Sequence, residues 1–291
     1  MITGVSLVLV LISALIHPIW NILLKRSEHK LVFYLHIHLV FTLLFCFLFW
    51  VFPVNKISSA GWAFILLSAV AHFLYQVFLC RTYELGDISL TYPVVRSSPI
   101  FVAILGFIFL KELPSALAMA GIIIIIVGTQ ILSLDRFNLK GIFKPLKKEN
   151  RKPVIAAALT ALFSAFYSAV DKKGVLEVNP IMFFYLFFAI SGLLFAVYVF
   201  YFAESRKKFI KVFTDNKFNI VLASLLEFAS YVLILYAFRL SKVAYVVALR
   251  QVSVVFAALF GTMLLKERNF ALRITGSVVI FVGIFLITVF G

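Results

Sequence analysis

Ten long apolar runs constrain what this chain can fold into more than any other feature. A transmembrane helix needs about 20 consecutive, mostly apolar residues. Runs of this kind lie at residues 2–24, 31–53, 60–81, 88–110, 114–134, 153–171, 180–202, 218–239, 243–265 and 270–290. An open sheet cannot cross a bilayer, and a membrane barrel would show short alternating segments in place of these unbroken runs. We therefore expect an all-α integral membrane protein with ten transmembrane helices.

The composition agrees with a membrane environment and excludes a soluble domain. Hydrophobic residues make up 64% of the 291 positions and charged residues only 13%, about half the charged fraction of soluble domains. The net charge of +15 does not predict nucleic-acid binding, because the cations lie in short blocks between the apolar runs. Cys46 and Cys80 lie inside apolar runs, where we expect them to act as small buried hydrophobic residues.

A basic stretch divides the chain into two related halves of five predicted helices. The expected organisation is a first repeat at 1–134, a basic linker at 135–152 and a second repeat at 153–291. A shift of 155 residues places the Leu-Lys-Glu at 110–112 on the Leu-Lys-Glu at 265–267, and it gives 12 identities in the 28 positions from 101 to 128. Because each half has an odd number of helices, the halves must have opposite orientations. The sequence thus predicts an inverted repeat around a central cavity, an architecture of alternating-access transporters.

Glycines recur at matching places in the two halves. The shift places Gly121 on Gly276 and Gly128 on Gly283. The members of each half's pair are two helical turns apart, so both lie on one face of their helix. Small residues at this spacing are typical of close helix packing in membranes, and we expect these faces to pack against another helix and not to contact a ligand.

Short motifs give the chain a resemblance to a known family. Leu-Lys-Glu closes one predicted helix in each half, and the helix that follows carries glycines seven residues apart. The run from Tyr83 to Arg96 and the run from His17 to Asn21 add to the pattern. On these residues the chain resembles the drug/metabolite transporter superfamily, in its EamA-like ten-helix branch, over essentially its whole length. It also resembles a bacterial subgroup associated with phosphonate utilisation.

The resemblance has implications for architecture and orientation. It implies a basket of ten helices with a cavity lined by helices 1, 3, 4, 6, 8 and 9, with helices 5 and 10 mainly structural and both termini inside the cell. The charge distribution predicts the opposite orientation. The loops after odd-numbered helices, with Arg273, carry 19 Lys and Arg, whereas the loops after even-numbered helices carry 6. Because cationic loops stay in the cytoplasm, this count places both termini outside, and we follow the count.

Charged side chains at membrane depth are costly and mark candidate functional sites. Of the twelve carboxylates, we expect only Glu227 near the middle of a spanning helix. Arg96 lies between Pro93 and Pro99, which predicts a kinked helix at that point. One interpretation is that Arg96, with Tyr92 one turn earlier, binds an anionic substrate group such as a carboxylate or phosphonate. The alternative is that Arg96 neutralises Glu227 inside the bundle.

Glu227 is our candidate for proton coupling, because desolvation favours the neutral form of a carboxyl group. The alternative is a structural, hydrogen-bonded carboxyl. Ser230 and Tyr231 share its helix face, and the shift of 155 places these three residues on His72, Tyr75 and Gln76. Two helices thus present polar residues at repeat-related positions, as a cavity between inverted halves requires. His72 is the second candidate for proton coupling.

Helices 1, 6 and 9 supply the other predicted substrate contacts. A shift of 147 residues places His17, Trp20 and Asn21 on Ser164, Tyr167 and Ser168, and Gln251 beside Arg250 is the repeat mate of Arg96. Aromatic walls with a few polar groups are typical of ligand cavities. Alternatives are a packing role for His17, a membrane-interface position for Trp20 and an Arg250 that extends to the headgroups. The predicted substrate-binding set is Arg96, Tyr92, Trp20, Asn21, His17, Tyr75, Gln76, Tyr167, Ser168, Tyr231, Arg250 and Gln251.

These observations together predict a function. The sequence has no Walker-type phosphate loop, HExxH zinc motif or GxSxG elbow, so we expect no enzyme activity, cofactor or metal. The expected function is secondary active export of a small polar or anionic metabolite by proton-coupled alternating access in the cell (inner) membrane. The expected partners are the substrate and membrane lipid, not nucleic acid, and we expect a monomer or homodimer. The alternative is a flippase for a lipid-linked metabolite, which would need a lateral opening between helices.

Overall fold

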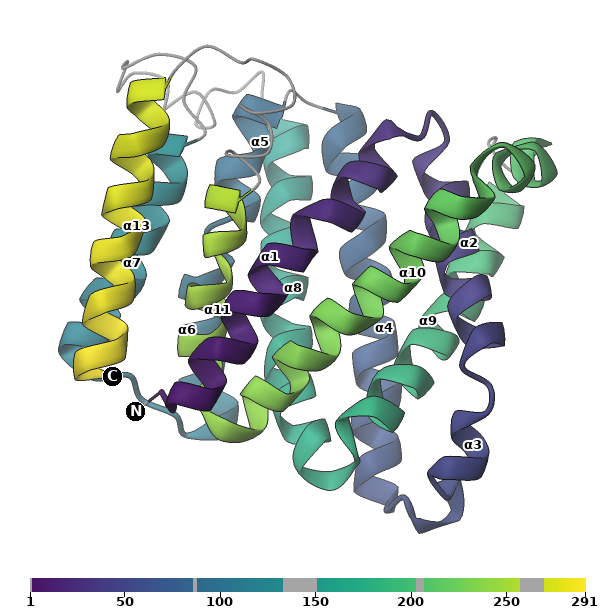
Figure 1. The fold of residues 1–291 in the computed structure, drawn as a ribbon, viewed down its shortest axis with the longest axis horizontal. Coiled ribbons are helices and arrows are strands. Elements are labelled where there is room, and N and C mark those ends of the chain that lie inside the picture. Colours follow the sequence, from purple (N-terminus) through teal and green to yellow (C-terminus); the bar gives the residue numbers. More distant parts are fainter. Residues whose placement is uncertain (1, 86–87, 133–150, 203–206, 257–269) are drawn as a thin grey trace.

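The structure, a computed structural model, describes residues 2–85, 88–132, 151–202, 207–256 and 270–291. Throughout these residues the secondary structure is helical (Figure 1). The elements are α1 (Gly4–Arg26), α2 (Lys30–Leu44), α3 (Leu48–Val51), the 3₁₀ turn η1 (Val54–Lys56), α4 (Ser59–Leu85), α5 (Ile88–Val95), α6 (Ser98–Leu110), α7 (Ala116–Leu132), α8 (Arg151–Glu177), α9 (Pro180–Phe202), α10 (Phe209–Leu240), α11 (Val243–Arg250) and α13 (Phe270–Phe290).

Apolar helices in the described residues correspond in order to the ten predicted runs. Five of them, in α1, α4, α8, α9 and α10, are long and apolar enough to cross a membrane. Shorter apolar helices lie at Lys30–Leu44, Ser98–Leu110, Ala116–Leu132, Val243–Phe256 and Ile274–Phe290. The prediction of an all-α membrane protein is confirmed.

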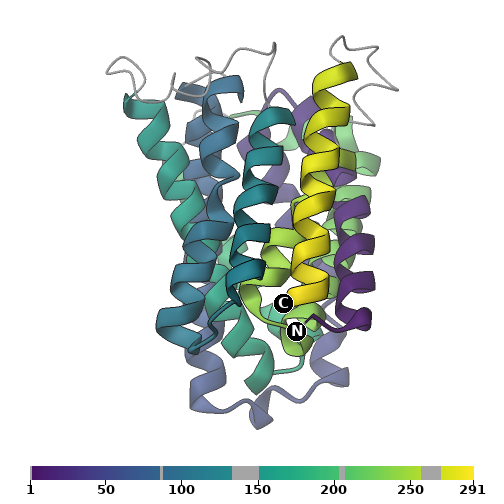
Figure 2. The ribbon, with the colours of Figure 1, turned by 90° about the vertical axis from the view of Figure 1, so that its left-hand side faces the viewer.

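The helices run alternately up and down, and the two ends of the chain lie at the same end of the bundle (Figure 2). We call this the terminal end; it holds Thr3 and Gly291. The opposite end, where α1 finishes at Arg26 and α10 begins after Lys208, is called the basic end. The basic linker at 135–152 and the second Leu-Lys-Glu, at 265–267, lie outside the described residues.

Packing between the halves shows the repeat in space. Helix α1 packs against α10, and their counterparts α8 and α4 pack against each other; α2 packs on α10 as α9 packs on α4. Each contact therefore recurs with the halves exchanged, as an inverted repeat requires. A further pair, α7 and α13, comes from equivalent places in the two halves and packs side by side at one edge of the bundle (Figure 1).

The glycine faces join α7 to α13, as predicted. A Cβ added at Gly121 would lie 2.7 Å from the carbonyl oxygen of Gly283, and one at Gly283 would lie 2.6 Å from that of Gly121. Gly128 and Gly276 approach each other in the same way, at 2.9 Å in both directions. The two backbones are thus close enough that any side chain at these four positions would collide with the facing helix.

Two predicted helices contain breaks near the middle of the bundle. The run at 88–110 divides into α5 and α6, with Arg96 and Ser97 between them, and Pro99 lies in the first turn of α6. The run that begins at 243 likewise has a turn at Gln251, after α11. The kink predicted from the prolines around Arg96 is therefore present, and its repeat mate is broken at the equivalent residue without a proline.

Other boundaries differ from the predicted runs for local reasons. Helix α2 ends at Leu44, and the short α3 follows, so the run at 31–53 is not one helix. Helix α8 continues to Glu177, beyond the expected end at 171, because the charged side chains of Asp171 and Lys172 are buried against partners. Helix α10 begins at Phe209 with a kink at Asn216 (φ −128°, ψ 18°), so its spanning part starts where the apolar run does.

Labelling from outside the cell tests the orientation. In a variant without Cys46 and Cys80, we expect an impermeant maleimide to label Asn55→Cys on intact cells and to leave Lys207→Cys unlabelled until the cells are opened. Both positions are exposed, Asn55 at the terminal end and Lys207 at the basic end. We expect this pattern because Lys and Arg are in excess at the basic end, and cationic segments stay in the cytoplasm. The reverse pattern would show that both termini are inside, as the family resemblance implies.

Candidate functional site

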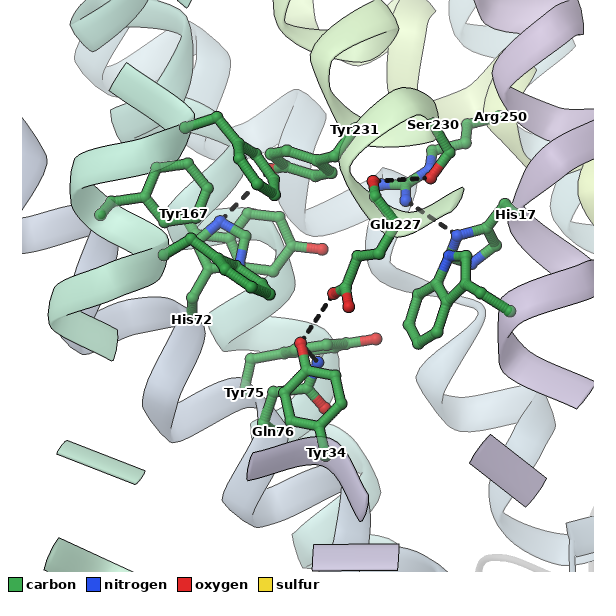
Figure 3. A pocket seen from close by; sticks show the side chains of 14 residues that line it. His17, Tyr34, His72, Tyr75, Gln76, Tyr167, Glu227, Ser230, Tyr231 and Arg250 are labelled. Atoms are coloured by element: carbon green, nitrogen blue, oxygen red, sulfur yellow. Dashed lines mark hydrogen bonds between the residues drawn. The ribbon is translucent and has the colours of Figure 1, made fainter. Parts of the chain in front are cut away.

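A cavity lies between the two halves of the bundle (Figure 3). Its volume is about 40 Å³, which is space for a few water molecules. Helices α1, α2 and α4 of the first half and α8 to α11 of the second supply its walls. The lining residues are His17, Trp20, Tyr34, His72, Tyr75, Gln76, Tyr167, Phe184, Phe187, Phe188, Glu227, Ser230, Tyr231 and Arg250.

Glu227 on α10 extends into the cavity from a buried position. Its Oε1 accepts a hydrogen bond of 2.8 Å from the Tyr34 hydroxyl, which in turn accepts one of 2.7 Å from Gln76 Nε2. Its Oε2 is buried and has no hydrogen-bond partner among the described residues. A buried carboxylate oxygen without a donor is costly, so this oxygen is placed to hold a proton or to accept a hydrogen bond from a ligand.

Arg250, the last residue of α11, also lines the cavity and lies near Ser230 and His17 (Figure 3). Its Nη2 donates to His17 Nδ1 over 3.2 Å, and its guanidinium carbon lies 5.3 Å from the centre of the Tyr231 ring. The turn that follows α11 at Gln251 brings this permanent cation to the cavity wall, because the helix ends there. The alternative that Arg250 extends to the headgroups does not describe this structure.

The walls between Glu227 and Arg250 are aromatic. Trp20 is 6% exposed, and its ring meets the His17 ring edge-on with centroids 5.2 Å apart. Its indole Nε1 is buried and has no hydrogen-bond partner among the described residues. The cavity therefore combines a carboxyl group, a guanidinium, a free indole donor and apolar ring faces, which is the composition expected of a site for a small ligand with polar groups.

Arg96 has a different setting from the predicted one. It lies in the break between α5 and α6, where Nη1 donates to Gln251 Oε1 over 3.2 Å and the guanidinium carbon is 4.8 Å from the centre of the Tyr92 ring. Arg96 and Gln251 are repeat mates, so this bond joins the two broken helices at the pseudo-twofold axis. Neither residue, nor Tyr92, is among those that line the cavity.

The structure brings most of the predicted set together. His17, Trp20, His72, Tyr75, Gln76, Tyr167, Glu227, Tyr231 and Arg250 all line the cavity. Asn21 and Ser168 do not, because both bond within their own helices. The Asn21 amide reaches the backbone oxygen of His17, and the Ser168 hydroxyl reaches that of Ser164.

Sequence reasoning missed the walls that α2 and α9 supply. Tyr34 on α2 and the phenylalanines of α9 line the cavity, although the resemblance implied that only helices 1, 3, 4, 6, 8 and 9 would do so. Tyr34 precedes two histidines in an otherwise apolar run. This concentration of polar groups could have indicated that the helix lines a cavity. The phenylalanines of α9 could not be singled out from the sequence, because Phe occurs 34 times in the chain.

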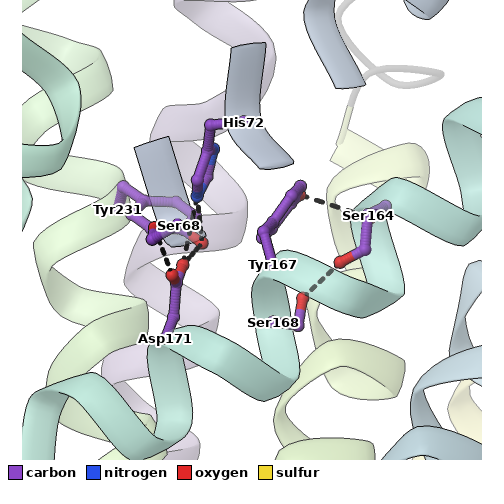
Figure 4. A network of polar contacts seen from close by, with 7 residues as sticks. All are labelled: Ser68, His72, Ser164, Tyr167, Ser168, Asp171 and Tyr231. Carbon is purple, nitrogen blue, oxygen red and sulfur yellow. Dashed lines mark hydrogen bonds and ion pairs between the residues drawn. The ribbon is translucent and has the colours of Figure 1, made fainter. Parts of the chain in front are cut away.

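A second carboxylate at membrane depth corrects the expectation that Glu227 is alone there. Asp171 is fully buried in α8, and its carboxylate accepts hydrogen bonds from Ser68, His72 and Tyr231 (Figure 4). Sequence reading placed it at a helix end because Lys172 and Lys173 follow it. In the structure Lys172 is itself buried and lies 3.5 Å from Glu112 Oε1, so this charged segment belongs to the bundle.

In the described part of the chain, apolar helices in two inverted halves surround a cavity that holds buried charged groups, which is the architecture of a membrane transporter of small molecules. The EamA-like transporter family matches residues 4–134 and, a second time, residues 151–289. The chain therefore belongs to the EamA-like transporter family. No match was found among curated proteins.

Comparison with solved structures shows a similar fold over most of the chain. One of those that match, described only as "Crystal structure of protein", is 14% identical, with a TM-score of 0.75 over 97% of this chain and 96% of the other. At this identity the likeness concerns the fold. Membership of the family makes the protein a membrane transporter, whereas the phosphonate subgroup stays a prediction.

Proposed function

We propose that this protein is a proton-coupled secondary transporter that exports a small metabolite with a polar or anionic group through the cavity between its halves. The observation that carries the proposal is the presence in one cavity of a buried carboxyl with an unpaired oxygen, Glu227, and a partly buried guanidinium, Arg250. In alternating access the same central site faces the two sides of the membrane in turn. The proposed location is the cell (inner) membrane, where a proton gradient can drive export.

The two charged groups have complementary roles in this proposal. Arg250 offers donors to an anionic or carbonyl group of the substrate, assisted by the Trp20 indole. Glu227 releases its proton when substrate occupies the cavity and takes up a proton when the substrate leaves. Tyr34 supports this exchange, because its hydroxyl donates to the ionised carboxylate and can rotate when the carboxyl is protonated.

Ligand binding to the purified protein tests the proposal. We expect a thermal-shift screen with phosphonates, carboxylates, zwitterionic amino compounds and neutral sugars to select compounds that carry an anionic group. Arg250→Lys should then weaken binding of the best compound by about 10- to 100-fold, because a point charge replaces a planar donor group that bonds a charged partner. The exposed Arg239 provides the matched control, and Arg239→Lys should bind as the wild type does.

Two results would count against this assignment. If Arg96→Lys weakens binding while Arg250→Lys does not, the anion site lies at the helix break and not in the cavity. If no water-soluble compound in the screen binds but a lipid-linked one does, the protein is a flippase. That alternative requires a lateral opening to lipid.

A further inference from the structure

Asp171 connects three helices through its hydrogen bonds (Figure 4). Its Oδ1 accepts a 2.6 Å hydrogen bond from Ser68 on α4, and its Oδ2 accepts bonds of 2.5 Å from the Tyr231 hydroxyl on α10 and 3.1 Å from His72 Nε2 on α4. One carboxylate on α8 thus holds α4 and α10. Separation of α8 from its two neighbours would break all three bonds.

The charge of this cluster depends on a single proton. Asp171 is fully buried, and the ion pair found for it in the described part of the chain is with His72. If the histidine is protonated, or if the carboxyl is, the pair is neutral; without that proton a net negative charge stays buried, which is costly at membrane depth. The His72 ring also stacks between Tyr167 and Phe187, at 3.9 and 4.5 Å between centroids, and aromatic faces favour a cation.

The cluster is connected to the cavity. His72 and Tyr231 line the cavity and also bond to Asp171, so a proton from water in the cavity reaches the carboxylate through either side chain. Other charged or titratable groups surround the pair on its own and neighbouring elements. These groups are His38 on α2, Tyr75 on α4, Tyr167 and Lys172 on α8, Glu227 and Tyr231 on α10, and Arg250 on α11.

Lys172, the residue after Asp171, makes a second set of contacts between helices. Its Nζ donates to the backbone oxygens of Phe238 and Ser241, at the terminal end of α10, and pairs with Glu112 after α6. Glu112 Oε2 in turn accepts the Val243 backbone N–H at the start of α11 over 2.7 Å. In this structure the terminal ends of α6, α8, α10 and α11 are therefore bonded together next to Asp171.

We propose that Asp171 and His72 form a second proton-binding site and that the bound proton keeps the terminal end of the bundle closed. This inference rests on the proposed function, because it concerns a proton-coupled alternating-access cycle. Loss of the proton leaves one uncompensated charge, and opening toward water relieves it. The closed state thus binds one more proton than the open state, so rising pH favours opening, by up to about tenfold in the open-to-closed ratio per pH unit.

The position of this site follows the repeat. His72 is the mate of Glu227 under the shift of 155 residues, so the two proton sites occupy equivalent places in the inverted halves. Tyr34, which bonds to Glu227, lies near the start of α2 at the basic end, whereas Asp171, which bonds to His72, lies near the end of α8 that is toward the terminal end. Two sites related in this way can govern the two ends of the same cavity.

Spin-label distances measured at different pH test the inference without a substrate. Nitroxide labels on Leu176→Cys and Leu240→Cys, both exposed at the terminal end, report the separation of α8 from α10 in lipid nanodiscs after replacement of Cys46 and Cys80. We expect the wild-type distances to lengthen as the pH rises. Asp171→Asn removes the charge and keeps one acceptor oxygen, while the hydroxyl of Ser68 or Tyr231 that faces the new NH2 group can turn to accept from it. Its distances should therefore stay short at every pH.

His72→Gln should have the opposite effect, which a merely structural role would not produce. Glutamine can donate to Asp171 but cannot carry the proton, so the closed state then requires protonation of the carboxyl itself, and the distances should lengthen at a lower pH than in the wild type. Glu28→Gln, which changes an exposed carboxylate at the basic end, should keep the wild-type response. The inference is overturned if the wild type shows no pH response, if Asp171→Asn and His72→Gln change in the same direction, or if Glu227→Gln alone abolishes the response. In that last case the proposed role of Glu227 would still stand.

Discussion

Replacement of Glu227 by glutamine should abolish substrate-driven proton movement while much of the substrate binding is retained. Glutamine has nearly the same shape, and its Oε1 can accept the Tyr34 hydrogen bond that Glu227 Oε1 accepts at 2.8 Å. It cannot take up a proton at Oε2, which is buried and lacks a partner among the described residues. A proton-exchange cycle that passes through this oxygen therefore stops.

Proteoliposomes with a trapped pH dye provide the measurement, with the best compound from the thermal-shift screen as substrate. We expect the wild type to move protons when this compound is added, and Glu227→Gln to match protein-free liposomes. Glu28→Gln, an exposed carboxylate at the basic end, should behave as the wild type does. If Glu227→Gln still moves protons, coupling passes through His72 and Asp171 alone. If the wild type moves none, the protein is a uniporter.

Replacement of Gly121 by valine should prevent stable folding. Its Cβ would lie 2.7 Å from the Gly283 carbonyl oxygen and 2.9 Å from an Ile287 side-chain carbon, and a backbone oxygen cannot move aside as a flexible side chain can. The helices α7 and α13 would have to separate along their whole contact. Overpacking of this kind costs about 1–3 kcal/mol or more per site, so we expect a much lower melting temperature or no monodisperse protein in detergent.

A control for this prediction is available at Gly4, where an added Cβ would meet nothing within 4 Å. Gly4→Val should therefore melt close to the wild type, while Gly121→Val and Gly283→Val should both be strongly destabilised. If the melting temperature of Gly121→Val equals that of the wild type, the close approach of α7 and α13 does not contribute to stability. Size-exclusion chromatography of heated samples distinguishes these outcomes.

Much of the fold could be predicted from the sequence because the bilayer imposes a length and a composition on every spanning helix. The repeat was visible for a related reason: Gly121 and Gly283 belong to helices that meet across the symmetry axis, where only glycine fits. Helix breaks were harder to predict. The prolines around Arg96 indicated one break, but the equivalent break at Gln251 has no proline and gave no local signal.

The site was predictable where polar residues stand out against apolar helices, as Glu227 and His72 do. It was not predictable where burial depends on a partner distant in sequence. Asp171 looked like a helix end because two lysines follow it, and only the positions of Ser68 and Tyr231 reveal that it is a buried acceptor. Likewise, nothing local indicates that Arg250 lines the cavity while Arg96 bonds to Gln251.

Alternating access to the cavity is the central claim, and a cysteine inside the cavity tests it most directly. Ser230 lines the cavity and is 1% exposed, so we choose Ser230→Cys in the background without Cys46 and Cys80. We predict that an impermeant maleimide labels it slowly from outside in right-side-out vesicles and also from the opposite face in inverted vesicles, and that labelled protein no longer transports. Labelling from one face only, or transport that survives full labelling, would contradict the account.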